Sequence, residues 1–160
     1  MEEDLNRYND SGRKTGLWIE YPLKGRRTEI YYQDGVEHGL FRIYDNDQLS
    51  LMGELDHGIL CGSYFSFNNQ FLMSKVDHIR QIRKEDNGSV WQRGRFVGYY
   101  PSGIISEEGD LIWDSESDPL NDFSIQVGEW KFYGEDGHIL MRREFPEKSA
   151  SEGSTSIYSP

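Results

Sequence analysis

The amino-acid sequence predicts an all-β protein, an elongated array of stacked antiparallel β-hairpins. One observation is a pattern in which a glycine is followed by an aromatic residue two positions on and another five positions on. The pattern occurs five times in the 160 residues, starting at Gly16, Gly39, Gly62, Gly94 and Gly128. The other observation is that short β-branched and aromatic runs alternate with Gly, Asn and Asp clusters, which is typical of strands joined by tight turns. Together they indicate a repeat architecture.

The first two copies of the pattern define the repeat. They span residues 16–38 and 39–61, and each is 23 residues long. Each holds one aromatic stretch, a turn and a second extended stretch, so that one copy is one hairpin and the array is a β-meander. We expect residues 1–15 to be a lead-in with a partial repeat and 16–145 to be the repeat domain. Residues 146–160 are Ser-rich and are expected to be a flexible C-terminal tail.

Copies three and four are longer than the first two. Gly62 to Gly94 is 32 residues and Gly94 to Gly128 is 34 residues. In copy three, Asn87-Gly88 lies between two extended runs and is a strong hairpin signal, which favours longer strands. A helix over 73–84 is the alternative, because Val76, Ile79 and Ile82 also fall near helical spacing. In copy four the extra residues, 114–122, are rich in Ser, Asp and Pro and are expected to form a loop.

The aromatic residues of the pattern are the candidate binding residues. Side chains alternate between the two faces of a strand, so the two aromatics lie on opposite faces unless a bulge separates them. The leading glycine would let the ring of a neighbouring hairpin lie flat across its backbone. Core packing accounts for most of these rings, and exposed ones would anchor a protein partner. The predicted protein-binding residues are the first aromatics of the five copies, lining the concave side: Trp18, Phe41, Tyr64, Phe96 and Trp130.

The overall charge narrows the class of partner. The formal net charge is −11, which opposes binding to nucleic acid and to anionic lipid, so we expect neither. Another protein, with a basic surface, is the expected partner. The acidic stretch 107–129 and the basic strip 75–95 are expected to pair with each other, within one chain or between chains. An open end strand could also pair with a second copy to give a homodimer.

Location and chemistry are predicted from what the sequence lacks. It has no run of about 20 apolar residues and no basic-plus-apolar start after Met1. Its single cysteine, Cys61, excludes a disulfide within the chain. We therefore expect a bacterial cytoplasmic protein. It contains no nucleophile-elbow or phosphate-cradling motif, so neither an enzyme nor a cofactor is predicted.

Histidine spacing does not predict a metal site. The four histidines, His38, His57, His78 and His138, share no position in the repeat. A metal ion requires several ligands that converge. The sequence therefore gives no ligand set, and no metal is predicted.

The repeat resembles a known family. Gly-x-Trp-x-x-Tyr at 16–21, with Gly25 nine positions after the first glycine, and Gly-Glu-Leu-x-x-Gly at 53–58 are similar to the MORN-type repeat. They are closer to its longer bacterial variant, often labelled an antitoxin-component family. The resemblance covers roughly residues 8–145, and copies three and four depart from it through their insertions. It implies a MORN-like hairpin stack and a non-catalytic scaffold for protein–protein interaction, with an antitoxin or immunity-like role. The alternative is a small-ligand module that binds carbohydrate on exposed rings.

Overall fold

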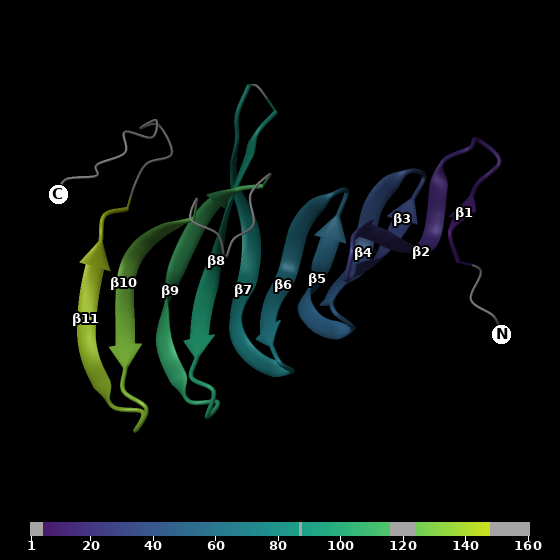
Figure 1. Cartoon of the computed structure of the whole chain (residues 1–160). Helices are drawn as coiled ribbons and strands as arrows, with labels where there is room; N and C mark the ends of the chain where they lie inside the picture. The colour runs from purple at the N-terminus through teal and green to yellow at the C-terminus, as the bar shows by residue number, and fades with distance from the viewer. Residues whose placement is uncertain (1–4, 87, 116–123, 148–160) are drawn as a thin grey trace.

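The computed structural model describes residues 5–86, 88–115 and 124–147. They form one open antiparallel sheet in which the spatial order of the strands equals their order in the sequence (Figure 1). This arrangement confirms the predicted all-β class and the stacked hairpin meander. Most of the predicted loop at 114–122, and all of the predicted tail beyond residue 147, lie outside the described residues.

Eleven strands make up the sheet. They are β1 (Arg7–Tyr8), β2 (Lys14–Leu23), β3 (Arg26–Gln33), β4 (Val36–Asp45), β5 (Gln48–Asp56), β6 (Ile59–Asn68), β7 (Phe71–Lys84), β8 (Val90–Tyr99), β9 (Ile105–Asp114), β10 (Ile125–Tyr133) and β11 (Ile139–Phe145). The described ranges contain no helix. The helical alternative for 73–84 is wrong, because these residues lie within β7 and pair with β6 and β8.

Tight turns join most of the strands, as the Gly, Asn and Asp clusters predicted. At the β3–β4 turn Asp34 and Gly35 have φ of 51° and 86°, and at the β4–β5 turn Asn46 and Asp47 have φ of 49° and 63°. Two central residues with positive φ match the right-handed twist of the flanking strands and close a two-residue hairpin. The predicted hairpin between copies three and four is also present, since Lys84 pairs with Val90.

Gly94 is a leading glycine that carries a ring, since a Cβ there would lie 3.1 Å from the ring of Trp113, but other rings lie on glycines that do not lead the pattern. In copy two the leading Gly39 has φ of 82°, beside an irregularity in strand pairing, where a side chain would be strained. The rings of Trp130 and Phe41 lie instead over glycines of the return strands. A Cβ on Gly109 would lie 2.2 Å from the ring of Trp130, and one on Gly53 would lie 2.8 Å from the ring of Phe41. The prediction of a ring over glycine therefore holds at the leading Gly94, and it holds at Gly53 and Gly109, which the pattern did not single out.

One face of the sheet, which we call the core face, carries the apolar core. A continuous row crosses it, with one residue from each strand from β2 to β11: Trp18, Ile30, Phe41, Gly53, Tyr64, Val76, Phe96, Gly109, Trp130 and Arg143. Partly buried residues on either side, such as Tyr32, Ile43 and Leu51, pack against this row. A single sheet therefore covers its own core by curving and by flanking the central row with further apolar side chains.

The other face, which we call the charged face, carries a second continuous row from β2 to β11. Its members are Ile19, Glu29, Arg42, Met52, Phe65, Lys75, Val97, Glu108, Lys131 and Arg142. The second aromatics of the pattern contribute here: the Tyr133 hydroxyl donates to Glu108 at 2.6 Å, and the Arg27 guanidinium lies 4.1 Å from the ring centre of Tyr44.

A register shift accompanies the second aromatic of every copy, between Glu20 and Leu23 in the first and immediately before the aromatic in the others. The sequence left open whether a bulge or two separate ladders would explain the spacing of the aromatics. Bulges and two separate ladders are both present. Each copy has a bulge beside its second aromatic, but the bulge does not bring the two aromatics onto the same face.

The centre of the sheet is its most deeply buried part. The longer strands of copy three extend beyond their neighbours (Figure 1) and bring Val90 and Gln92 of β8 into the core. Gln92 donates from Nε2 to the carbonyl of Leu60 in β6, across β7. The largest fully buried side chains all belong to β7–β10: Trp113, Trp130, Gln92, Val76 and Val127.

Candidate interaction surfaces

The five predicted protein-binding residues share one face, but most of them are withdrawn from solvent. Exposure is 8% for Trp18, 9% for Phe41, 4% for Tyr64 and 2% for Trp130, and Phe96 is half-buried. Their rings pack on one another, as where Phe96 stacks on Trp130 with centroids 5.6 Å apart. The row predicted to line the concave side is part of the core, because partly buried side chains such as Tyr32 and Ile43 pack against it. Its role in binding a protein stays a prediction.

One exposed apolar surface lies at the β11 end of the sheet, although exposed apolar side chains such as Leu23 and Phe71 also occur elsewhere. Ile139, Leu140 and Met141 are 43%, 71% and 49% exposed, and six of the seven residues of β11 are exposed. Within the described residues β11 pairs only with β10. One row of its backbone N–H and C=O groups therefore faces away from the sheet, next to apolar side chains. A strand of this kind can template the pairing of another chain.

The charges on β11 are partly engaged within the molecule. Arg142 pairs with Glu129 of β10 at 3.0 Å on the charged face. On the core face the Arg143 guanidinium lies 4.7 Å from the ring centre of Phe145. The apolar end of the strand, at Ile139–Met141, is thus the part of this edge with no charged side chain.

Ion pairs cover the charged face over β8–β10. Arg95 contacts Glu108 at 3.1 Å and Asp110 at 3.2 Å, and Arg93 contacts Asp110 at 2.7 Å. The hydrogen bond from Tyr133, together with Arg95 and Lys131, holds the pKa of Glu108 below its usual value despite partial burial. These contacts confirm the predicted pairing with the acidic stretch, within one chain, for Arg93 and Arg95, whereas Lys75 and Arg83 pair with acidic residues inside the basic strip. The network links neighbouring strands through charged side chains.

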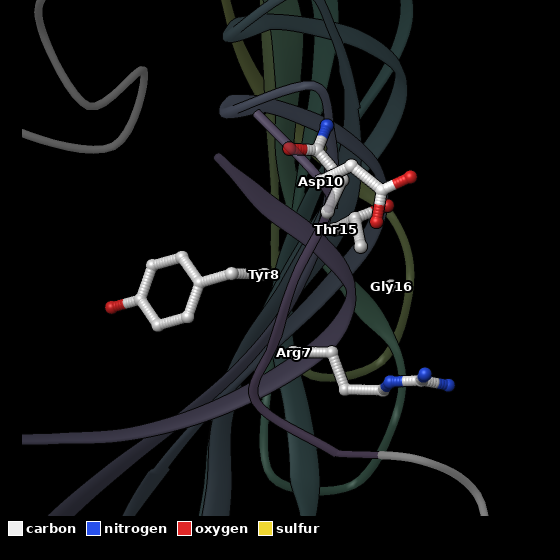
Figure 2. A pocket seen from close by; sticks show the side chains of 6 residues that line it. Arg7, Tyr8, Asp10, Thr15 and Gly16 are labelled. Carbon is white, nitrogen blue, oxygen red and sulfur yellow. The ribbon is translucent and has the colours of Figure 1, made fainter. Parts of the chain in front are cut away.

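A shallow pocket of about 450 Å³ lies at the β1–β2 hairpin and is lined by Arg7, Tyr8, Asn9, Asp10, Thr15 and Gly16. In Figure 2 the side chains of Tyr8 and Arg7 point in opposite directions. Tyr8 is 62% exposed and meets the ring of Trp18 edge-on at 5.0 Å. This pocket offers a sugar the one exposed ring of Tyr8 and not several rings in a row. The pocket therefore gives the carbohydrate alternative little support.

The sequence analysis missed one group of side chains. The potential ligand atoms of His38, Asp56 and His57 lie within 4.8 Å of one another. The three residues lie where the start of β4 is next to the β5–β6 turn. The signal that could have found them is the hairpin itself. Gly39 pairs with Leu55, so His38 and Asp56 are the next residues beyond the last pair of β4 and β5.

Comparison with known proteins adds no relative. No protein-family model matches the chain, and no curated protein matches it either. Among the described residues there is no helix with the length and apolar character needed to cross a membrane.

Proposed function

We propose that this protein is a non-catalytic scaffold for protein–protein interaction, and that a strand of its partner pairs with β11. The observation that carries the proposal is the edge formed by β11, which pairs with β10 alone among the described residues and exposes three consecutive apolar side chains. Addition of a strand to an open sheet edge is a common mode of protein recognition. In that mode main-chain hydrogen bonds supply affinity and side chains supply specificity.

Charge and side-chain chemistry describe the partner. The chain carries a net charge of −11, so long-range attraction favours a partner with a basic surface. Leu140 and Met141 would bury their exposed area against apolar side chains of the added strand. The resemblance to the bacterial antitoxin-component repeat suggests a basic toxin as the partner. A strand from a second copy of this chain is the alternative that the experiment must separate.

The test places charges on the edge. Leu140→Lys combined with Met141→Lys should weaken partner binding at least tenfold, because a strand that docks there would bury two ammonium groups. Binding is measured by quantitative affinity capture from the native host, with self-association measured separately by sedimentation velocity. The matched control is Leu23→Lys, which changes a 65% exposed leucine at the opposite end of the sheet.

The proposal requires that the control keeps wild-type binding and that all variants keep the wild-type circular dichroism spectrum. Concentration-dependent dimers abolished only by the β11 variant would identify a second copy as the occupant. Equal capture by wild type and the β11 variant would rule out this edge as the binding site.

A further inference from the structure

We propose that His38, Asp56 and His57 bind a divalent transition-metal ion of the zinc class. His38 lies in β4, Asp56 is the last residue of β5, and His57 is the first residue of the turn to β6. Their donor atoms lie within 4.8 Å of one another. Within the described residues, no other set of three or more His, Cys, Asp or Glu side chains converges in this way.

The backbone brings the three side chains together. Gly39 pairs with Leu55, so His38 and Asp56 directly follow the last pair of the β4–β5 ladder, and their side chains approach to 3.3 Å. His57 has φ of 52° and Gly58 has φ of 77°, so the chain reverses immediately after Asp56. The Gly58 N–H donates to the carbonyl of Glu37 at 2.8 Å, which ties this turn to the residue preceding His38. The strand pairing and the turn thus place the ligands before any ion binds.

The distances fit a small ion. His38 Nδ1 and Asp56 Oδ1 are 3.3 Å apart, and His57 Nδ1 and Asp56 Oδ1 are 2.7 Å apart. Tetrahedral bonds of about 2.0–2.1 Å separate neighbouring ligand atoms by roughly 3.4 Å. The first pair already has this spacing, and the second must lengthen by about 0.7 Å. The His57 side chain is 80% exposed and can rotate to allow it.

The ligand types select the class of ion. Imidazole favours Zn²⁺, Cu²⁺ and Ni²⁺, whereas Ca²⁺ and Mg²⁺ prefer a set of oxygen ligands. Three protein ligands leave at least one coordination position for water or for a side chain of another molecule. The net charge of −11 also raises the local concentration of cations. The site would join β4 to the β5–β6 turn and keep an accessible face.

The direct test is a calorimetric titration of the full-length, tag-free, chelator-treated protein with Zn²⁺. We expect one ion per chain. We also expect at least a tenfold loss of Zn²⁺ affinity in His38→Gln and in His57→Asn, because loss of a residue that binds the metal should reduce affinity at least as much as loss of a residue that supports such a ligand. Asn is chosen at position 57 because it tolerates positive φ better than most residues and keeps the turn. Electron paramagnetic resonance with Cu²⁺ should show two nitrogen ligands in the wild type and one in each variant.

The control is His138→Asn. His138 also lies 3.3 Å from a carboxylate, that of Asp136, and is 84% exposed, but no third ligand converges on this pair within the described residues. Zn²⁺ affinity should therefore be unchanged. Absence of saturable binding in the wild type, or full affinity in the double variant His38→Gln/His57→Asn, would overturn the proposal. Circular dichroism of each variant establishes that a loss of affinity is not a loss of fold.

Discussion

Glu108 shows how single side chains join strands on the charged face. It lies in β9, accepts a hydrogen bond from Tyr133 of β10 and contacts Arg95 of β8 at 3.1 Å. It thereby links three consecutive strands. Because these partners favour the carboxylate, the pKa of Glu108 lies below the usual value of a glutamate. A carboxyl group with a lowered pKa in the folded state stabilises the fold above its unfolded pKa, and that stabilisation is lost as pH falls through the folded pKa.

Removal of the Tyr133 hydroxyl tests this link. We expect Tyr133→Phe to reduce the free energy of unfolding at pH 7 by about 1 kcal/mol, somewhat less than is typical of a hydrogen bond to a charged group, because solvent partly screens this part-buried contact. The difference from wild type should shrink as pH falls through the lowered folded-state pKa of Glu108, because the carboxylate that accepts the hydrogen bond then becomes protonated. Urea unfolding at several pH values measures both effects.

Tyr44 is the matched control, since it occupies the same position in copy two. Its hydroxyl lies 3.5 Å from Glu29, near the limit of a hydrogen bond, compared with 2.6 Å for Tyr133 and Glu108. Tyr44→Phe should therefore change stability much less. Equal losses in the two variants would mean that the hydrogen bond to Glu108 is not the cause.

At the scale of the strand, the recurring device is a ring packed on a neighbouring glycine. The Trp130 ring occupies the space where Gly109 would carry a side chain, and its Nε1 donates to the carbonyl of Asp110 at 3.2 Å. The ring is therefore fixed by packing and by a hydrogen bond. A side chain at Gly109 would displace Trp130 and separate β9 from β10.

Gly109→Ala should lower the free energy of unfolding by about 3 kcal/mol, the upper range for overpacking a core. The control is Gly58→Ala: its φ of 77° strains alanine, but an added Cβ would meet no atom within 4 Å. That strain alone costs about 1–2 kcal/mol. Denaturant unfolding measures both variants, and a larger loss for Gly58→Ala would contradict the ring-on-glycine account.

Local patterns were sufficient to predict the strands but not their pairing details. The Gly-x-aromatic phrase and the Asn, Asp and Gly turns predicted the hairpins, and the signal at Asn87-Gly88 correctly favoured long strands over a helix. The sequence could not decide between a bulge beside each second aromatic and a separate aromatic ladder on each face. An offset of one residue changes which side chains face each other without changing the alternation in the sequence.

The candidate sites were harder to predict because exposure is a property of the whole sheet. The sequence correctly grouped Trp18 and Trp130 on one face, but their burial depends on curvature and on flanking residues such as Tyr32 and Ile43. The His38–His57 group was missed because the histidines were compared by repeat position and not by their place across the hairpin. Edge exposure at β11 depends on which strand ends the sheet.

For the whole molecule, burial is concentrated in the middle of the array. Side chains that are less than 2% exposed lie in β7–β10, whereas β2–β5 bury fewer residues completely. Stability in such a sheet is a sum of contributions from neighbouring units, so it need not be uniform.

Native-state hydrogen exchange should therefore be slowest for amides of β7–β10 and faster for β2–β5. Exchange followed by mass spectrometry of peptides from each strand measures the difference. We expect protection factors in β8 and β9 to exceed those in β3 and β4 by at least about tenfold, because the central strands open only when the largest core is disrupted. Uniform protection along the chain would mean that the sheet unfolds as one cooperative unit.

The match between strand order and sequence order has a consequence for biosynthesis. Every strand finds its partners among segments that directly precede or follow it in the chain. The relative contact order of such a meander is low, which favours rapid folding. A hairpin that emerges from the ribosome can dock on the one made before it, without waiting for the C-terminus. Each new hairpin then extends a growing β-ribbon, so the polypeptide can acquire its native pairing while translation continues.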